Sequence, residues 1–145
     1  MSDTSTAAPQ LPPEGEQRTV AIGNFTTEAG ADIAAVEIAF QRWGEYKGDP
    51  SGVNNVLLVE HALTGDANAA DWWCGAIGPG KALDTDEWCV VCTNALGSCY
   101  GSTGPASTHP DGTTWGSRFP AISIRDQVET LSLIHISEPT RRTPI

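Results

Sequence analysis

The sequence predicts an α/β fold with a mostly parallel central sheet that follows an initial antiparallel hairpin. Residues 19–25 form a β-like stretch, and residues 35–43 alternate between apolar and polar side chains, which is typical of a half-buried strand. Two continuous apolar runs, 56–59 and 88–93, are typical of strands that are buried on both faces of a parallel sheet. The segment between these runs can serve as a crossover, so the two runs predict a βαβ-like unit.

The hairpin is predicted from the alternation in its second strand. One side of that strand carries Val36, Ile38 and Phe40, and the other side carries Glu37 and Gln41. A turn at residues 26–30 connects it to the first strand. We therefore expect the two strands to pair.

The crossover and the later segments are less regular. After a loop at 61–71, we expect a short helix or turn at 72–77, ended by Gly78-Pro79-Gly80. Residues 94–120 are rich in Gly, Pro, Ser and Thr, and a loop of this length is commonly functional. Ser123 and Asp126 stand at the positions of a capping box and predict the start of a helix.

The two ends of the chain differ from its middle. Residues 1–18 are polar and proline-containing, and we expect them to be a disordered lead-in. Residues 131–145 become β-like and then basic, and they resemble the conceptual translation of sequencing-adapter read-through. We interpret 131–145 as a non-native tail and 19–130 as the domain.

Composition excludes several classes of function. Among 145 residues, 18 are acidic and 8 basic, a net charge of −10 that argues against binding to nucleic acid or anionic membranes. No apolar run is long enough to cross a bilayer, and Met1–Gln10 has no features of a secretory signal. We therefore expect a cytoplasmic protein whose cysteines are free thiols, namely Cys74, Cys89, Cys92 and Cys99.

The strongest local signal for chemistry is His61-Ala62-Leu63-Thr64-Gly65, directly after the first apolar run. Acyl transfer needs a main-chain N–H held rigidly where negative charge develops, and small residues let a backbone approach a substrate. A plain strand-to-helix turn is the alternative interpretation. A lone histidine at a strand end, such as His61, is more often structural than catalytic, and His109 lies in a polar loop.

The cysteines and tryptophans have simpler interpretations. Gly97-Ser98-Cys99-Tyr100-Gly101 has the glycine spacing of a nucleophile elbow, but Gly104 and Pro105 follow instead of a helix, which favours a structural or pocket-lining loop. Cys89 and Cys92 lie three residues apart in a predicted strand, so they face opposite ways and favour core thiols over a metal site. Trp72 and Trp73 either line a ligand tunnel or fill the core.

Five blocks together carry a family resemblance. They are Phe40–Gly44, Val59–Asp66, Ile77–Asp86, Asn94–Pro105 and Ile124–Asp126. In this order they resemble the N-terminal part of the homoserine O-acetyltransferase family, which has the α/β-hydrolase fold. The resemblance covers residues 19–129.

The resemblance implies ping-pong acyl transfer from acetyl-CoA to the hydroxyl of L-homoserine through an acyl-serine intermediate, with no permanently bound cofactor, no metal and a homodimeric parent enzyme. It assigns one oxyanion-hole donor to the main-chain N–H of Leu63. The family's serine elbow and triad Asp and His have no match here, and His61, His109 and His135 match no triad histidine. We therefore expect an inactive fragment with an incomplete α/β-hydrolase fold, in which the strand at 56–60 has an unpaired apolar edge.

Four other interpretations remain open at this stage. Related family members use succinyl-CoA with homoserine, or acetylate serine instead of homoserine. The chain could also be a noncatalytic small binding module, which predicts a cooperatively folded monomer. A thiol enzyme using Cys99 is the fourth possibility, and it requires loss of activity in Cys99→Ala.

Overall fold

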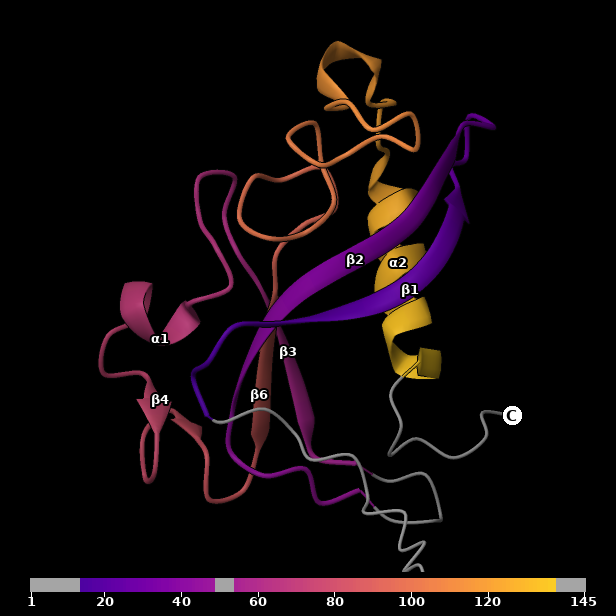
Figure 1. Ribbon diagram of the computed structural model, residues 1–145. Coiled ribbons are helices and arrows are strands. Elements are labelled where there is room, and N and C mark those ends of the chain that lie inside the picture. The colour runs from indigo at the N-terminus through magenta and orange to yellow at the C-terminus, as the bar shows by residue number, and fades with distance from the viewer. Residues whose placement is uncertain (1–13, 49–53, 138–145) are drawn as a thin grey trace, which may run out of the picture.

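A computed structural model describes residues 14–48 and 54–137, and Figure 1 shows the arrangement of their elements. Nothing is described for the remaining residues, which include most of the expected lead-in and the end of the expected tail. The elements in chain order are β1 (Arg18–Thr26), β2 (Asp32–Trp43), β3 (Val56–Glu60), α1 (Ala69–Trp72), β4 (Ile77–Gly78), β5 (Leu83–Asp84), β6 (Cys89–Thr93), the 3₁₀ helix η1 (Gly116–Arg118) and α2 (Ile124–Ser137).

The main sheet has four strands in the order β1-β2-β6-β3. β1 and β2 pair antiparallel, which confirms the predicted hairpin. β3 and β6 pair parallel, which confirms the crossover unit, although its helix α1 has only four residues and begins before the predicted position. β2 and β6 join these pairs antiparallel, so one of the three pairings in the described sheet is parallel. β4 and β5 form a separate two-stranded sheet.

The central position of β2 changes its predicted burial. Val36 and Ile38 are buried and Glu37 is exposed, as the alternation predicts. Gln41 is buried as well, and its side-chain Nε2–H donates to the carbonyl of Gly15 at 2.8 Å. The last residues of β2 are therefore covered on both faces of the sheet, because the segment before β1 lies against one of these faces.

β3 is the reverse case, and here the prediction of burial on both faces is wrong. Only Val59 is buried in this strand, and Leu58 is 46% exposed. β3 lies at the end of the sheet, and among the described residues it pairs with β6 alone. This arrangement agrees with the expected unpaired apolar edge of the strand at 56–60.

Two separate hydrophobic clusters hold the chain together. Cluster one lies between the hairpin and α2, which run side by side in Figure 1, and its buried residues are Phe25, Ile33, Val36, Ile38, Leu96 and Trp115. Cluster two lies under α1 and β4, and its buried residues are Trp43, Val59, Ala69, Ile77, Val90 and Cys92. Both clusters draw residues from the main sheet.

The start of α2 confirms the predicted capping box. The Ser123 hydroxyl accepts the Asp126 N–H at 3.1 Å, and the Asp126 carboxylate accepts the Ser123 N–H at 2.8 Å. The other Asp126 oxygen accepts the N–H of Glu28, in the hairpin turn, at 2.8 Å. Burial opposes ionisation of Asp126, but these hydrogen bonds outweigh it and lower the pKa of the carboxyl group.

The two chain ends differ from expectation in detail. α2 continues through residues 131–137, so the β-like interpretation of that stretch is wrong, and Leu133 and Ile134 pack against cluster one. The non-native origin of residues 131–145 stays a prediction. Near the other end, Gly15 donates its N–H to the Arg42 carbonyl at 2.8 Å, so contacts with the sheet begin within the expected lead-in. No helix in the described part has the length and hydropathy of a membrane span.

Candidate functional site

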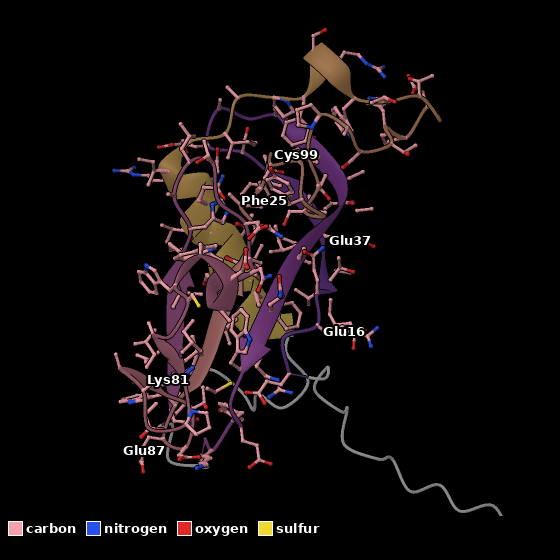
Figure 2. All side chains as sticks on the ribbon, turned by 90° about the vertical axis from the view of Figure 1, so that its left-hand side faces the viewer. Glu16, Phe25, Glu37, Lys81, Glu87 and Cys99 are labelled. Carbon is pink, nitrogen blue, oxygen red and sulfur yellow. The ribbon has the colours of Figure 1, made fainter. Side chains whose placement is uncertain are left out.

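A cavity of about 300 Å³ lies beyond the carboxyl ends of β3 and β6. Its walls come from the segment after β3 and from the segment after β6, and the residues that line it are His61, Leu63, Gly65, Gly97, Ser98, Cys99, Tyr100, Pro105 and Ala106. Figure 2 shows Cys99 at the end of the molecule opposite Glu87, which precedes β6. Ligands of open α/β sheets bind outside the carboxyl ends of the strands, and this cavity occupies that position.

Asn94 connects the two walls of the cavity. It directly follows β6 and is almost fully buried. Its side-chain oxygen accepts the N–H of Ala67 at 2.7 Å, and its side-chain nitrogen donates to the carbonyl of Tyr100 at 2.7 Å. One buried amide therefore fixes the segment after β3 and the segment after β6, while its own polar atoms are satisfied.

The wall after β6 is also attached to β2. The Ser102 hydroxyl accepts the N–H of Ala39 at 2.9 Å and donates to the carbonyl of Asn94 at 2.7 Å. Thr103 exchanges backbone and hydroxyl hydrogen bonds with Glu37. At Gly104 a Cβ atom would collide with the Ser98 carbonyl, so only glycine allows the backbone to turn back this closely. A loop without regular secondary structure is thus held at several points.

Leu63 occupies a tight turn three residues beyond β3. The N–H of Gly65 donates to the carbonyl of Ala62 at 2.8 Å, which makes Leu63 the second residue of a β-turn. Leu63 as a residue is 99% exposed. Leu63 lies outside the sheet ladders, beyond the carboxyl ends of the parallel pair, and it lines the cavity. This placement fits an oxyanion-hole donor, and the assignment itself stays a prediction.

His61 is held at both ring nitrogens. Nδ1 lies 2.7 Å from the carbonyl oxygen of Ala62, and Nε2 accepts the N–H of Ala95 at 3.1 Å. A histidine with both nitrogens engaged in backbone contacts has a structural role, as the lone-histidine argument favoured. His109 stacks edge-to-face on Trp115 in the loop after β6 and does not line the cavity. The side chain of His135 lies outside the described residues.

The remaining candidates divide between the cavity and the core. Cys99 is exposed in the cavity wall, and turns rather than a helix follow it, so it lacks the support of a nucleophile elbow. This agrees with a pocket-lining loop. Trp72 packs against cluster two and donates its indole N–H to the Asp66 carbonyl at 3.0 Å, whereas Trp73 is 47% exposed. Neither tryptophan lines the cavity.

The other thiols belong to the interior. Cys89 and Cys92 are buried in β6, as predicted. Burial raises the pKa of Cys92 to about 12, and the negative charges of Glu60 and Asp66 add to this rise. The thiol is therefore protonated and unreactive at neutral pH. Within the described ranges, His, Cys, Asp and Glu side chains do not gather into a group of three or more that could hold a metal.

Sequence reasoning missed the buried polar residues that hold the cavity walls in place. Asn94, Ser102 and Thr103 are small polar residues in a Gly-rich stretch, where such residues commonly face solvent. Their spacing carries no signal of burial. The hints were that a long loop in a compact domain is commonly functional, and that the block Asn94–Pro105 shares in the family resemblance.

Comparison with curated proteins identifies a set of close relatives. The chain is 65% identical over 121 residues to the homoserine O-acetyltransferase of Corynebacterium efficiens, which covers 83% of this chain and 32% of the relative. It is 56% identical over 127 residues to that of Nocardia farcinica and 51% identical over 137 residues to that of Mycolicibacterium smegmatis. These alignments cover 32% and 35% of the two relatives, so the chain spans about a third of the length of the proteins it matches. No protein-family model matches the chain.

Solved structures show the same fold. Esterase E22 superposes with a TM-score of 0.74 and 31% sequence identity, covering 84% of this chain and 37% of the esterase. Homoserine O-acetyltransferase from Bacillus anthracis superposes with a TM-score of 0.69 and 28% identity, covering 82% of this chain and 36% of that protein. These neighbours are α/β-hydrolase-fold enzymes, and the described sheet corresponds to part of their fold. The chain therefore corresponds over most of its own length to about a third of a homoserine O-acetyltransferase, and it has an incomplete α/β-hydrolase fold.

Proposed function

We propose that this chain supplies one half of an acyl-transfer site, in which the Leu63 main-chain N–H is an oxyanion-hole donor. The parent reaction is transfer of an acetyl group from acetyl-CoA to the hydroxyl of L-homoserine through an acyl-serine, as in methionine biosynthesis. The observation that carries the proposal is the position of Leu63, an exposed turn residue in the wall of a cavity at the carboxyl ends of β3 and β6. A homodimeric, cytoplasmic parent enzyme without a bound cofactor completes the proposal, and the homodimer and the lack of a bound cofactor rest on the family resemblance.

A chimera tests this function directly. Residues 14–130 replace the matching segment of the Corynebacterium efficiens relative, and the purified chimera is assayed with acetyl-CoA and L-homoserine. We expect turnover by the chimera and none by the 145-residue chain alone, because no serine elbow is found in this sequence. A correctly folded chimera without turnover contradicts the proposal, and so does turnover by the chain alone.

The turn at Leu63 allows a sharper test of the donor. Proline suits the second position of a β-turn, so Leu63→Pro removes the N–H while it keeps the turn. We expect Leu63→Pro to lower kcat of the chimera by about 10²–10³-fold. Leu63→Ala keeps the N–H and measures the contribution of the side chain. Equal effects of the two substitutions contradict the assignment of the main-chain donor.

The same assay separates the alternative reactions. Structural neighbours include esterases, and in an esterase-type reaction the acyl acceptor is water. Consumption of acetyl-CoA at the same rate with and without homoserine would indicate hydrolysis instead of transfer. Parallel assays with succinyl-CoA and with L-serine test the two related transferases. We expect acetyl-CoA and L-homoserine to give the highest kcat/KM.

A further inference from the structure

The peptide bond between Ala62 and Leu63 is held from its carbonyl side. The Ala62 oxygen accepts the Gly65 N–H at 2.8 Å and lies 2.7 Å from Nδ1 of His61. The described chain contains no cis peptide bond, and in a trans peptide the C=O and N–H point in opposite directions. Fixing the Ala62 carbonyl therefore fixes the direction of the Leu63 N–H.

The hydrogen bonds of His61 define its protonation state. A carbonyl oxygen can only accept, so Nδ1 must carry a hydrogen when it bonds to Ala62. The Ala95 N–H can only donate, so Nε2 must be without hydrogen to accept it at 3.1 Å. The two contacts together therefore fit the Nδ1–H tautomer of the His61 imidazole. Neither nitrogen is available to act as a general base without loss of a backbone contact.

The imidazole also links the turn to the sheet. Ala62, Leu63 and Thr64 are all exposed, so packing contributes little to the rigidity of the turn. His61 reaches from the end of β3 to Ala95, two residues beyond β6. The contact from Asn94 to Ala67 secures the other end of the segment. The turn is thus tied to the end of β6 on both sides.

We propose that His61 is a positioning residue, which in its neutral Nδ1–H form orients the Ala62–Leu63 peptide and so aims the Leu63 N–H. This rests on the proposed function for its catalytic meaning, but the orientation itself is a property of the 145-residue chain. In this role the side chain acts through the Ala62 carbonyl.

Nuclear magnetic resonance of the ¹⁵N-labelled full chain tests the positioning. In the unmodified chain, the imidazole nitrogen shifts of His61 should report a protonated Nδ1 and an unprotonated Nε2. The order parameter of the Leu63 amide should be about 0.85, which is typical of a rigid backbone. Shifts that report a protonated Nε2 and an unprotonated Nδ1 would overturn the proposal, and this test needs no variant.

Three variants separate orientation from general stability. His61→Phe removes both hydrogen bonds, and the Leu63 order parameter should fall below about 0.6. His61→Asn places an amide N–H near the position of Nδ1, and it should restore much of the lost order. His109→Phe is the matched control on a histidine outside the cavity and should leave Leu63 unchanged. If the order parameter of the Leu63 amide is unchanged in His61→Phe, the proposal is overturned. The proposal is also overturned if the amides of β3 and β6 lose as much order as the Leu63 amide.

The chimera keeps the two proposals apart. If Leu63 loses order in His61→Phe and kcat of the chimera falls at least tenfold, with recovery in His61→Asn, both proposals hold. If Leu63 loses order but kcat does not change, the positioning stands and the role of Leu63 in catalysis fails. If kcat falls while the Leu63 amide stays rigid, the positioning role fails and the proposed function is unaffected.

Discussion

The hairpin side and the β3 side of the molecule are stabilised in different ways. The hairpin packs against α2 through cluster one, and Asp126 hydrogen bonds its turn to the first turn of the helix. β3 pairs with β6 along one edge, packs against cluster two with Val59 and exposes much of Leu58. The hairpin is thus covered by another element of this chain, the helix α2. In contrast, β3 has the apolar composition of an interior strand but lies at the edge of the described sheet.

Core truncation gives the largest expected effect in this comparison. Ile38 is 1% exposed in cluster one, and Ile38→Ala should lower the free energy of unfolding by about 2–5 kcal/mol. Leu58→Ala removes a half-exposed side chain from β3 and should cost about 1 kcal/mol or less. Urea denaturation measures both values. Equal costs would show that the exposed face of β3 is covered in solution.

The capping carboxylate gives an effect of intermediate size. Asp126→Asn should lower the free energy of unfolding by about 1 kcal/mol, because a charged acceptor at the start of α2 is lost. The pKa of Asp126 is lowered in the folded chain, so its contribution is complete above the unfolded value of about 3.9 and is lost as pH falls through the folded value.

The pH dependence is the discriminating readout for Asp126. The variant should show a smaller decline of stability in acid than the unmodified chain, measured by urea denaturation between neutral and strongly acidic pH. Asp71→Asn makes the same chemical change at an exposed residue of α1 and serves as the control. The same acid response in both variants would contradict the interaction between helix and hairpin.

The open edge gives the smallest expected change in stability but a clear change in solubility. Leu58→Lys should alter the free energy of unfolding by about 0.5 kcal/mol or less, while it reduces concentration-dependent light scattering. Thr19→Lys adds the same charge to exposed β1, at the other end of the sheet. If both variants reduce scattering equally, then net charge, and not the β3 edge, controls association.

The sequence was informative where local chemistry decides the structure. The alternation at Val36–Ile38 predicted the hairpin, and the Ser123–Asp126 spacing predicted the helix start, because both signals depend on neighbours within a few residues. The burial of β3 could not be predicted in this way. A continuous apolar run indicates a strand suited to an interior, but whether both faces are covered depends on partners that are distant in sequence.

The candidate site shows the same division. The position of Leu63 after an apolar strand was readable, since strand ends and glycine-containing turns have local signals. The role of Asn94 was not readable, because its contacts reach Ala67 and Tyr100 across the fold. The two hydrogen bonds of His61 were hidden for the same reason, as one of them spans 34 positions of the chain.

The buried amide of Asn94 sets where this segment tolerates changes of length. Residues 61–67 and 94–100 are each held at both ends by contacts with Asn94 or the adjoining sheet, so an inserted residue in either would force one of these bonds apart. The loop around Asp111 closes upon itself through Arg118 and Thr113 instead. Added residues at its tip are therefore accommodated at the surface, and they leave the segments 61–67 and 94–100 in place.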